Sequence, residues 1–410
     1  MLLITFKNML HSISCKNFYS FGESNTLSFL VNDNAPQNNG YCKAPSGTRL
    51  SKVETVIGGN ASGKTNLLKT LPFLKWFIID SFNLDPQSLI NFRPFMFGEY
   101  KNKPAEISVV FEVETGVYTY SFILDQTKII SEELKLVSMA KEKKSSKKIF
   151  LRTWNSITKS YDFEGNNFNL PKRFENLIRS NASIIGVAMR LNHKESQEIV
   201  NFWRSVETNV SEAGWIGDNM FINRGQQLAE VLDFFSEQES LKKEAEKLLA
   251  RFDLGLNSFE IKKEKQDGGI SMMVNVLHSF GDQKEVLPIQ YESSGTKQLF
   301  ILLKHVLQAI SNGGVVVLDE FDVNLHPEMM IALFDLFIDP NTNEKNAQLL
   351  FSTHNHYILS KLDKYQITLV EKNEKGMSES WRLDEVSGVR ADDNYYTKYI
   401  AGAYGAVPKM

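Results

Sequence analysis

A glycine-rich stretch near the N-terminus has the residue types and spacing of a phosphate-binding loop. Glycines in such a loop let backbone N–H groups turn around a phosphate, and the following helix adds the positive end of its dipole. In this interpretation the Lys64 ammonium bridges the β- and γ-phosphates of a nucleotide, and the Thr65 hydroxyl ligates Mg²⁺. The alternative is a glycine-rich turn that matches by chance. The stretch fits the pattern G-x-x-x-x-G-K-[S/T] and consists of Gly58, Gly59, Asn60, Ala61, Ser62, Gly63, Lys64 and Thr65.

The flanks of this stretch favour the phosphate-binding interpretation. Residues 53–57 form a β-leaning run, and residues 66–71, which begin with Asn66, suit a helix. Strand, loop and helix in this order are the context that the motif requires. We therefore expect the loop and Asn66 to contact a nucleotide.

Two carboxylates follow a second candidate strand. Residues 315–318 are apolar without alternation, which is typical of a strand buried on both faces, and Asp319 and Glu320 come directly after them. Asp319 would ligate Mg²⁺ directly or through water, and Glu320 would polarise a water molecule at the γ-phosphate. An isolated strand of this kind could equally emerge into solvent at a charged loop. The presence of Lys64 in the same chain favours the catalytic interpretation.

Two further segments could reach a phosphate. Ser293, Ser294 and Gly295 open a helix whose apolar residues recur every three or four positions. This turn is first of all an N-cap, which needs no ligand, but its small side chains and free N–H groups also suit an anion. His354 ends a buried-type strand at 349–353. A histidine in that place is structural in many proteins and catalytic in fewer.

Composition limits the protein classes that these residues can serve. The chain has 410 residues, of which 42% are hydrophobic and 23% charged, so it has material for two or three lobes around ordinary cores. The 46 basic and 49 acidic residues give a net charge of −3, which confines any nucleic-acid contact to a local patch. Cys15 and Cys42 are too few for a disulfide framework. With no apolar run of membrane-spanning length and no signal peptide, we expect a cytoplasmic protein without a membrane partner.

The middle of the chain changes character along its length. Residues 105–136 alternate as antiparallel strands, and helical patterns dominate residues 172–252. Heptads are not sustained there, which disfavours a partner coiled coil. The basic run at 141–148 indicates a solvated hairpin tip, with nucleic acid or a partner protein as the alternative. His193, His278 and His305 have no Cys or His neighbour at metal-binding spacing.

Taken in order, these motifs resemble the head of an ABC-type ATPase. The resemblance rests on the phosphate loop and on residues 292–296, 315–320, 324–327 and 352–354. It implies an α/β fold with a P-loop sheet core, an antiparallel β part and a helical insertion. It also implies ATP and Mg²⁺ as cofactors and a homodimer, or a higher homo-oligomer, of ATP-sandwiched heads. In that class the turn 293–295 reaches the γ-phosphate held by a second subunit, and Glu320 and His354 are the catalytic base and the switch histidine.

More narrowly, the chain resembles the RloA-type and abortive-infection ATPases of bacterial phage defence, which are relatives of the ATPase half of OLD nucleases. Residues 15–21 are similar to the opening strand of that family, and residues 399–408 are similar to its end, with Ala403 where the family usually has arginine. The resemblance implies a sensor or regulatory subunit that works with a separate effector protein, for which a nuclease is one candidate class. Nucleic acid is a further candidate partner.

The spacing of the motifs suggests three regions. We expect an N-terminal ATPase lobe at 1–150, a mainly helical insertion at 151–285 and a C-terminal ATPase lobe at 286–410. The separation of Lys64 from Ser293 exceeds the short insertion of a transporter subunit and falls far below the long coiled coil of chromosome ATPases. A DNA-repair or chromosome-type clamp ATPase remains the alternative, with the nucleotide-binding subunit of a transporter ranked below it.

Overall fold

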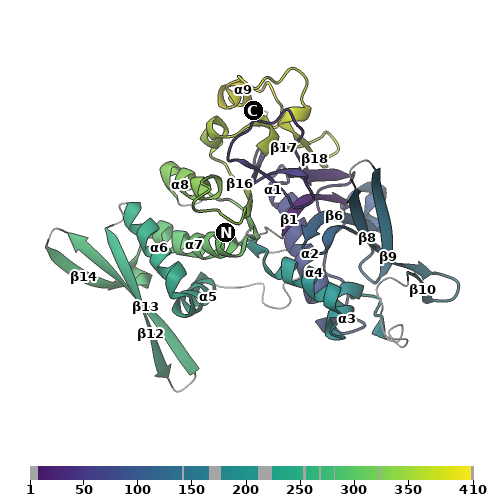
Figure 1. Cartoon of the computed structure of the whole chain (residues 1–410), viewed down its shortest axis with the longest axis horizontal. Helices are drawn as coiled ribbons and strands as arrows, with labels where there is room; N and C mark the ends of the chain where they lie inside the picture. Colours follow the sequence, from purple (N-terminus) through teal and green to yellow (C-terminus); the bar gives the residue numbers. More distant parts are fainter. Residues whose placement is uncertain are drawn as a thin grey trace.

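The computed structural model describes residues 8–140, 143–165, 177–210, 224–252, 255–266, 269–280, 282–322 and 325–407. A parallel sheet that carries the phosphate loop lies at its centre, beside a larger antiparallel sheet (Figure 1). The helices of the described residues are α1 (Lys64–Leu68), α2 (Thr70–Ile79), α3 (Ile184–Arg190), α4 (Lys194–Arg204), α5 (Arg224–Glu237), α6 (Glu239–Arg251), α7 (Ser294–Asn312), α8 (Pro327–Ile338) and α9 (Tyr395–Ile400). Within the described part of the chain, no helix has both the length and the apolar character that crossing a membrane requires.

The central sheet has six strands, of which only the last runs antiparallel to its neighbour. Val56, Val317 and Leu350 point to one hydrophobic core, whereas Ile57 and Val316 point to a second core on the opposite face. Burial on both faces explains why these strands are apolar without alternation. In spatial order the strands are β11 (Glu207–Thr208), β15 (Val315–Leu318), β16 (Gln348–Ser352), β5 (Val53–Ile57), β17 (Ile367–Lys372) and β18 (Ser378–Arg382).

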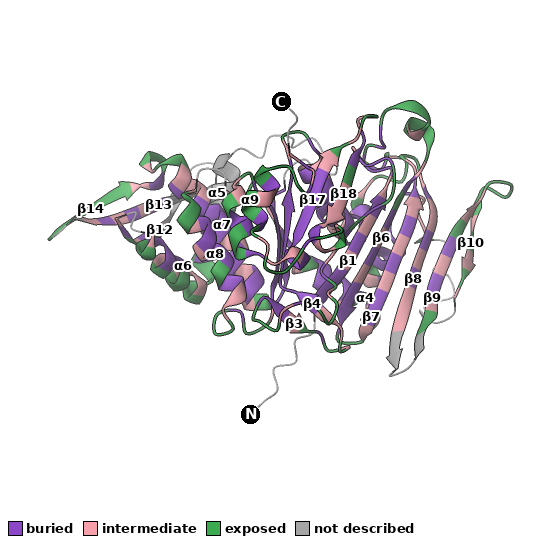
Figure 2. Ribbon diagram, turned by 90° about the horizontal axis from the view of Figure 1, so that it is seen from above, coloured by how far each residue is buried: buried purple, intermediate pink, exposed green. Residues whose placement is uncertain are grey.

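The second large sheet is antiparallel throughout and has seven strands (Figure 2). Helix α2 packs on it through aromatic rings, with the Phe77 ring centroid 4.5 Å from that of Phe122. The expected α/β architecture, with a P-loop sheet core and an antiparallel β part, is therefore confirmed. In spatial order the strands are β10 (Ser160–Glu164), β9 (Lys143–Asn155), β8 (Ile129–Ala140), β7 (Gly116–Leu124), β6 (Ala105–Val113), β1 (Met9–Lys16) and β2 (Asn25–Ser28).

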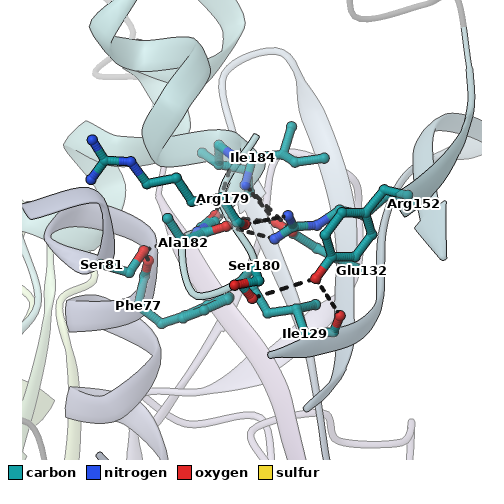
Figure 3. Close-up of polar contacts among 12 residues, drawn as sticks. Phe77, Ser81, Ile129, Glu132, Arg152, Arg179, Ser180, Ala182 and Ile184 are labelled. Atoms are coloured by element: carbon teal, nitrogen blue, oxygen red, sulfur yellow. Dashed lines mark hydrogen bonds and ion pairs between the residues drawn. The ribbon is translucent and has the colours of Figure 1, made fainter. Parts of the chain in front are cut away.

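A buried ion pair fastens the segment before α3 to this sheet (Figure 3). The Arg152 guanidinium lies 2.5 Å from the Glu132 carboxylate, and both side chains are completely buried. Arg152 also donates to the carbonyl of Ala182 at 2.5 Å, and Glu132 accepts from the amide of Ile184 at 3.0 Å. A buried charge needs such partners, because water cannot reach it.

Two smaller sheets complete the described strands. The first pairs β3 (Tyr41–Lys43) with β4 (Arg49–Ser51). The second joins β12 (Leu256–Gln266), β13 (Gly269–Phe280) and β14 (Gln283–Pro288), and it projects away from the body of the molecule (Figure 1). This projecting sheet lies in the region expected to be mainly helical. Within the helical patterns at 172–252, the last part forms two helices, α5 and α6, on either side of Gln238.

Two local expectations need correction. Strand β1 ends at Lys16, and the rest of the opening motif is a turn, because Asn17 and Tyr19 have left-handed φ values of 51° and 49°. Lys147 and Lys148 lie within strand β9 and not at a hairpin tip. Residues 141–142, between β8 and β9, lie outside the described residues. The region boundaries at 150 and 285 stay a prediction, and residue 150 falls inside β9.

Candidate functional site

The phosphate loop joins β5 to α1, and Lys64 begins the helix. Gly63 caps the helix with a left-handed φ of 118°. The Lys64 ammonium donates to the carbonyls of Gly58 and Gly59 at 2.9 and 3.0 Å. Burial lowers the pKa of Lys64, against the opposing charges of Asp319, Glu320 and Asp322. The lysine therefore lies across its own loop and near the acidic residues of the second motif.

The loop glycines are needed because neighbouring strands approach closely. A Cβ atom on Gly58 would lie 2.0 Å from the carbonyl oxygen of Val370 on β17, and one on Gly63 would lie 2.2 Å from Ser378 Oγ on β18. Real Cβ atoms do not come so near, so any side chain at either position would push the loop from these strands. The loop conformation is thus set by packing as well as by glycine's backbone freedom.

Two serines outside the motif support the loop. Ser378 Oγ donates to the carbonyl of Ser62 at 2.5 Å and lies 2.7 Å from Ser20 Oγ. The Asn66 amide donates to Ser20 Oγ at 2.9 Å, so Asn66 helps to hold the loop as well as facing the cavity described below. Sequence reasoning did not identify Ser20 or Ser378 as site residues. Ser20 belongs to the opening motif at 15–21, which was the only available signal.

The two acidic residues follow β15 and are held by the next strand, β16. Ser352 Oγ donates to Asp319 Oδ1 at 2.5 Å and accepts from the Glu320 amide at 2.9 Å. Glu320 has a left-handed φ of 49°, which is uncommon for a residue with a side chain. Backbone strain of this kind persists where the surroundings enforce it. The exposed Glu320 side chain is therefore carried by a constrained backbone.

His354 lies at the end of β16, beside the acidic residues. Asp322 Oδ1 accepts from the His354 amide at 3.1 Å and from Thr353 Oγ1 at 2.7 Å. The His354 side chain is exposed. Nearby, burial lowers the pKa of His356, and the charges of His354 and Lys64 lower it further. The structure thus brings the strand-end histidine to the same edge of the sheet as the phosphate loop.

One cavity unites most of the residues that the sequence singled out. Its volume is about 880 Å³. Gly58 and Gly59 do not line the cavity, but their carbonyls accept from the Lys64 ammonium. Lys372, an exposed residue at the end of β17, is an addition that no motif predicted. The residues that line the cavity are Asn60, Ala61, Ser62, Gly63, Lys64, Thr65, Asn66, Asp319, Glu320, His354 and Lys372.

The turn at 293–295 is not part of this cavity. Ser293 Oγ accepts from the Thr296 amide at 3.1 Å and caps α7, so its N-cap role is present in the structure. Ser293 and Ser294 are exposed, and His278 Nε2 lies 2.7 Å from Glu292 Oε1 just before them. The contribution of this turn to a second subunit's nucleotide stays a prediction.

The cavity offers oxygen ligands of the kind that Mg²⁺ prefers. Thr65 and Asp319 line it together and present a hydroxyl and a carboxylate. Within the described ranges, no group of three His, Cys, Asp or Glu side chains is placed to hold a metal by itself. The residues therefore fit a Mg²⁺ ion whose remaining ligands are phosphate oxygens and water.

Comparison with known proteins found a matching family and several similar solved structures. Among curated proteins, none matches the sequence. Three solved structures that match it are head domains of SMC proteins. The one from Thermotoga maritima is 15% identical, covers 91% of this chain and 98% of its own, and has a TM-score of 0.42. The one from Pyrococcus furiosus, solved with the C-terminal domain of ScpA, is 14% identical. It covers 92% of this chain and 97% of its own, and it has a TM-score of 0.46. The one from Pyrococcus yayanosii is 12% identical, covers 97% of this chain and 99% of its own, and has a TM-score of 0.47.

The family match covers most of the chain and includes every motif of the cavity from the phosphate loop to His354. It extends over residues 55–360 and is to the model described as "AAA domain, putative AbiEii toxin, Type IV TA system". With its phosphate loop and paired acidic residues facing one cavity, this chain belongs to that AAA-domain family.

Proposed function

We propose that this protein is a cytoplasmic ATPase that binds ATP with Mg²⁺, dimerises through its heads and acts as the sensor or regulatory subunit of an anti-phage defence system with a separate effector. The observation that carries the ATPase part is the single cavity of about 880 Å³ that Lys64 and Thr65 share with Asp319 and Glu320. A phosphate-binding loop that faces a carboxylate pair can hold the phosphates and Mg²⁺ and can orient a water molecule for phosphoryl transfer.

In this proposal, the phosphate loop and the acidic residues of the cavity have separate tasks. The loop N–H groups and the Lys64 ammonium bind phosphate oxygens, and the Lys64 ammonium exchanges its loop carbonyls for them. Thr65 and Asp319 would hold Mg²⁺, which when bound neutralises charge on the phosphates. Glu320 orients a water molecule and accepts its proton, and His354 faces the same space from the end of β16.

The dimer is supported by the position of the turn at 293–295. The turn is exposed at the N-terminus of the 19-residue helix α7 and does not line the chain's own cavity. A helix N-terminus with free N–H groups suits the phosphate of a neighbouring subunit. In this arrangement each nucleotide lies between the phosphate loop of one head and the turn of the other.

Gly295→Asp tests the dimer. We expect this variant to bind ATP as a monomer but to lose ATP-dependent dimerisation, because a carboxylate would face a phosphate. The fold should tolerate the change, since an acidic residue suits the first turn of a helix. Light scattering in the Glu320→Gln background measures dimerisation, and Ser387→Asp, which adds the same charge in an exposed turn, is the control. Unchanged dimerisation of the Gly295→Asp variant would leave only the N-cap role.

The defence role is supported by the sequence resemblance to abortive-infection ATPases and by the toxin-system wording in the description of the matched family. We expect cells that express this chain alone to show neither toxicity nor phage protection, and cells that express the whole native operon to be protected. Lys64→Ala in the operon should remove the protection. Protection by the single gene, lost on Lys64→Ala, would show that no separate effector is needed.

A clamp ATPase that encircles DNA is the alternative function. The longest helix among the described residues, α7, has 19 residues, so a long coiled-coil arm is not part of the described structure. A clamp should be retained on circular DNA in an ATP-dependent manner and should slide off linear DNA. We expect no such retention.

We also expect replacement of Lys143, Lys144, Lys147 and Lys148 by glutamine to leave nucleic-acid binding unchanged, because charge clusters on protein surfaces are usually just solvated. Lys148 in addition pairs with Glu164 at 2.9 Å.

A further inference from the structure

Asn209 uses its side chain to hold both backbone groups of one residue in the second motif. Its Oδ1 accepts from the Asp319 amide at 2.7 Å, and its Nδ2 donates to the Asp319 carbonyl at 3.0 Å. Strand β15 ends at Leu318, so Asp319 lies beyond the sheet's own ladder. The Asn209 amide group therefore replaces a strand neighbour at the first acidic residue of the site.

The strand that directly precedes Asn209 is short but firmly placed. Strand β11 has only two residues, and it pairs in parallel with β15 through Glu207 and Thr208. From the side of the phosphate loop, the Lys75 ammonium on α2 donates to the carbonyl of Val206 at 2.5 Å. The backbone just before Asn209 is thus tied both to β15, the strand of the acidic residues, and to α2, the second helix after the loop.

Helix α7 also holds β11, through hydrogen-bonded and charged side chains. Glu207 Oε2 lies 2.9 Å from Lys304 Nζ and 2.9 Å from His305 Nδ1, and its side chain is 8% exposed. Burial by itself would raise the pKa of Glu207, but the hydrogen bond to His305 and the charge of Lys304 outweigh burial and lower it. The ionised carboxylate and its two partners fix β11 against α7. The backbone that leads into Asn209 is consequently held in place next to Asp319.

We infer that Asn209 is a positioning residue for hydrolysis, which sets the direction of the Asp319 carboxylate and of Glu320 through the backbone of Asp319. Glu320 directly follows the clamped residue and has the left-handed φ of 49°. Ser352 fixes the Asp319 side chain, and Asn209 fixes its backbone. Because Lys64 and the loop bind the phosphates, Asn209 should govern the rate of the chemical step and not the affinity for ATP.

The kinetic arm of the test rests on the proposed ATPase activity. Asn209→Ala should lower kcat roughly ten- to hundredfold, because a small displacement of a catalytic group has such an effect, while the Kd for ATP stays within about twofold. The control is Asn201→Ala, an exposed asparagine on α4. A folded Asn209→Ala variant with wild-type kcat would overturn the inference. Loss of ATP affinity and kcat together would also contradict it, because that pattern indicates a general structural role.

Hydrogen exchange of the nucleotide-free protein provides an arm that needs no activity. The Asp319 amide should exchange about fivefold faster or more in Asn209→Ala, because its acceptor is gone. Asn209→Asp retains an acceptor oxygen and loses the donor, so it should keep slow exchange at Asp319 with an intermediate kcat. This variant also carries the test if Asn209→Ala does not fold. A wild-type protein without hydrolysis would refute the proposed function, whereas unchanged exchange in Asn209→Ala would refute the clamp.

Discussion

The hydroxyl of Ser352 holds the carboxylate of Asp319 at 2.5 Å and at the same time accepts the amide of the next residue, Glu320, at 2.9 Å. One side chain from β16 thus fixes both acidic residues at the end of β15. The two strands pair in parallel with Leu318 opposite Phe351, so the hydroxyl lies one residue beyond their ladder. The catalytic geometry proposed for this site depends on that alignment of neighbouring strands.

Replacing Ser352 by alanine should separate geometry from binding. We expect Ser352→Ala to lower kcat for ATP hydrolysis about tenfold or more, because Asp319 and Glu320 lose their common support, with little change in ATP affinity. Steady-state kinetics and equilibrium binding measure the two effects. Ser360→Ala, an exposed serine after β16, is the control. A normal kcat in Ser352→Ala would mean that the hydroxyl does not position the acidic residues.

A methyl group at Gly58 should disrupt the loop through packing alone. The new Cβ would meet the Val370 carbonyl oxygen at 2.0 Å, and a backbone atom cannot rotate away. We expect Gly58→Ala to lower the free energy of unfolding by about 1–3 kcal/mol and to abolish ATP binding. Gly376→Ala is the control. Its φ of 75° brings backbone strain, but the new Cβ would meet no packed atom within 4 Å. Equal effects of the two substitutions in denaturant unfolding would contradict the close approach.

The buried ion pair of Figure 3 should be costly to break on one side only. Arg152→Met leaves the fully buried Glu132 carboxylate without its charged partner, and we expect a loss of about 3–5 kcal/mol in the free energy of unfolding. The double variant with Glu132→Gln should recover part of the loss. Lys16→Met, which breaks an exposed pair with Glu106, should cost no more than about 1 kcal/mol. Similar losses for Arg152→Met and Lys16→Met would refute the role given to burial.

Glu54 on β5 should make stability depend on pH. Burial raises the pKa of Glu54 from 4.5 to about 8, and the charge of Arg382 and the hydrogen bond from Thr368 only partly oppose this. The stability gained by the protonated carboxyl is complete below pH 4.5 and is lost as the pH rises through about 8. Between pH 4.5 and about 8, the free energy of unfolding of Glu54→Gln should therefore rise relative to that of the wild type by about 1.4 kcal/mol per pH unit. Glu106→Gln is the exposed control, and parallel stability profiles of wild type and Glu54→Gln would contradict the shift.

The sequence was sufficient for the parts of the site in which local pattern and chemistry coincide. Lys64 and Thr65 follow a buried strand, Asp319 and Glu320 follow another, and parallel strands bring both ends to one edge. Strands 105–124 were predictable because alternation reports a half-buried antiparallel sheet. Pattern alone therefore predicted three strands of the central sheet, at 53–57, 315–318 and 349–353, and the residues that end beside the cavity.

The supporting residues were beyond reach of the sequence, because they act across long separations. Ser378 meets Ser62 from 316 positions away, and Asn209 meets Asp319 from 110. A single serine or asparagine has no periodicity that marks it. Lys372 likewise enters the cavity only because β17 lies next to β5.

The measurement that tests the ATPase most directly compares two variants of the cavity. Glu320→Gln should bind ATP with Mg²⁺ as the wild type does but hydrolyse it at least about a hundredfold more slowly, because the amide cannot accept the water's proton. Lys64→Ala should fail to bind ATP at all, because the loop loses its ammonium. Equilibrium ATP binding and phosphate release by the purified protein give both values. If Glu320→Gln hydrolysed ATP at the wild-type rate, or if Lys64→Ala bound ATP normally, this cavity would not be the site of ATP hydrolysis.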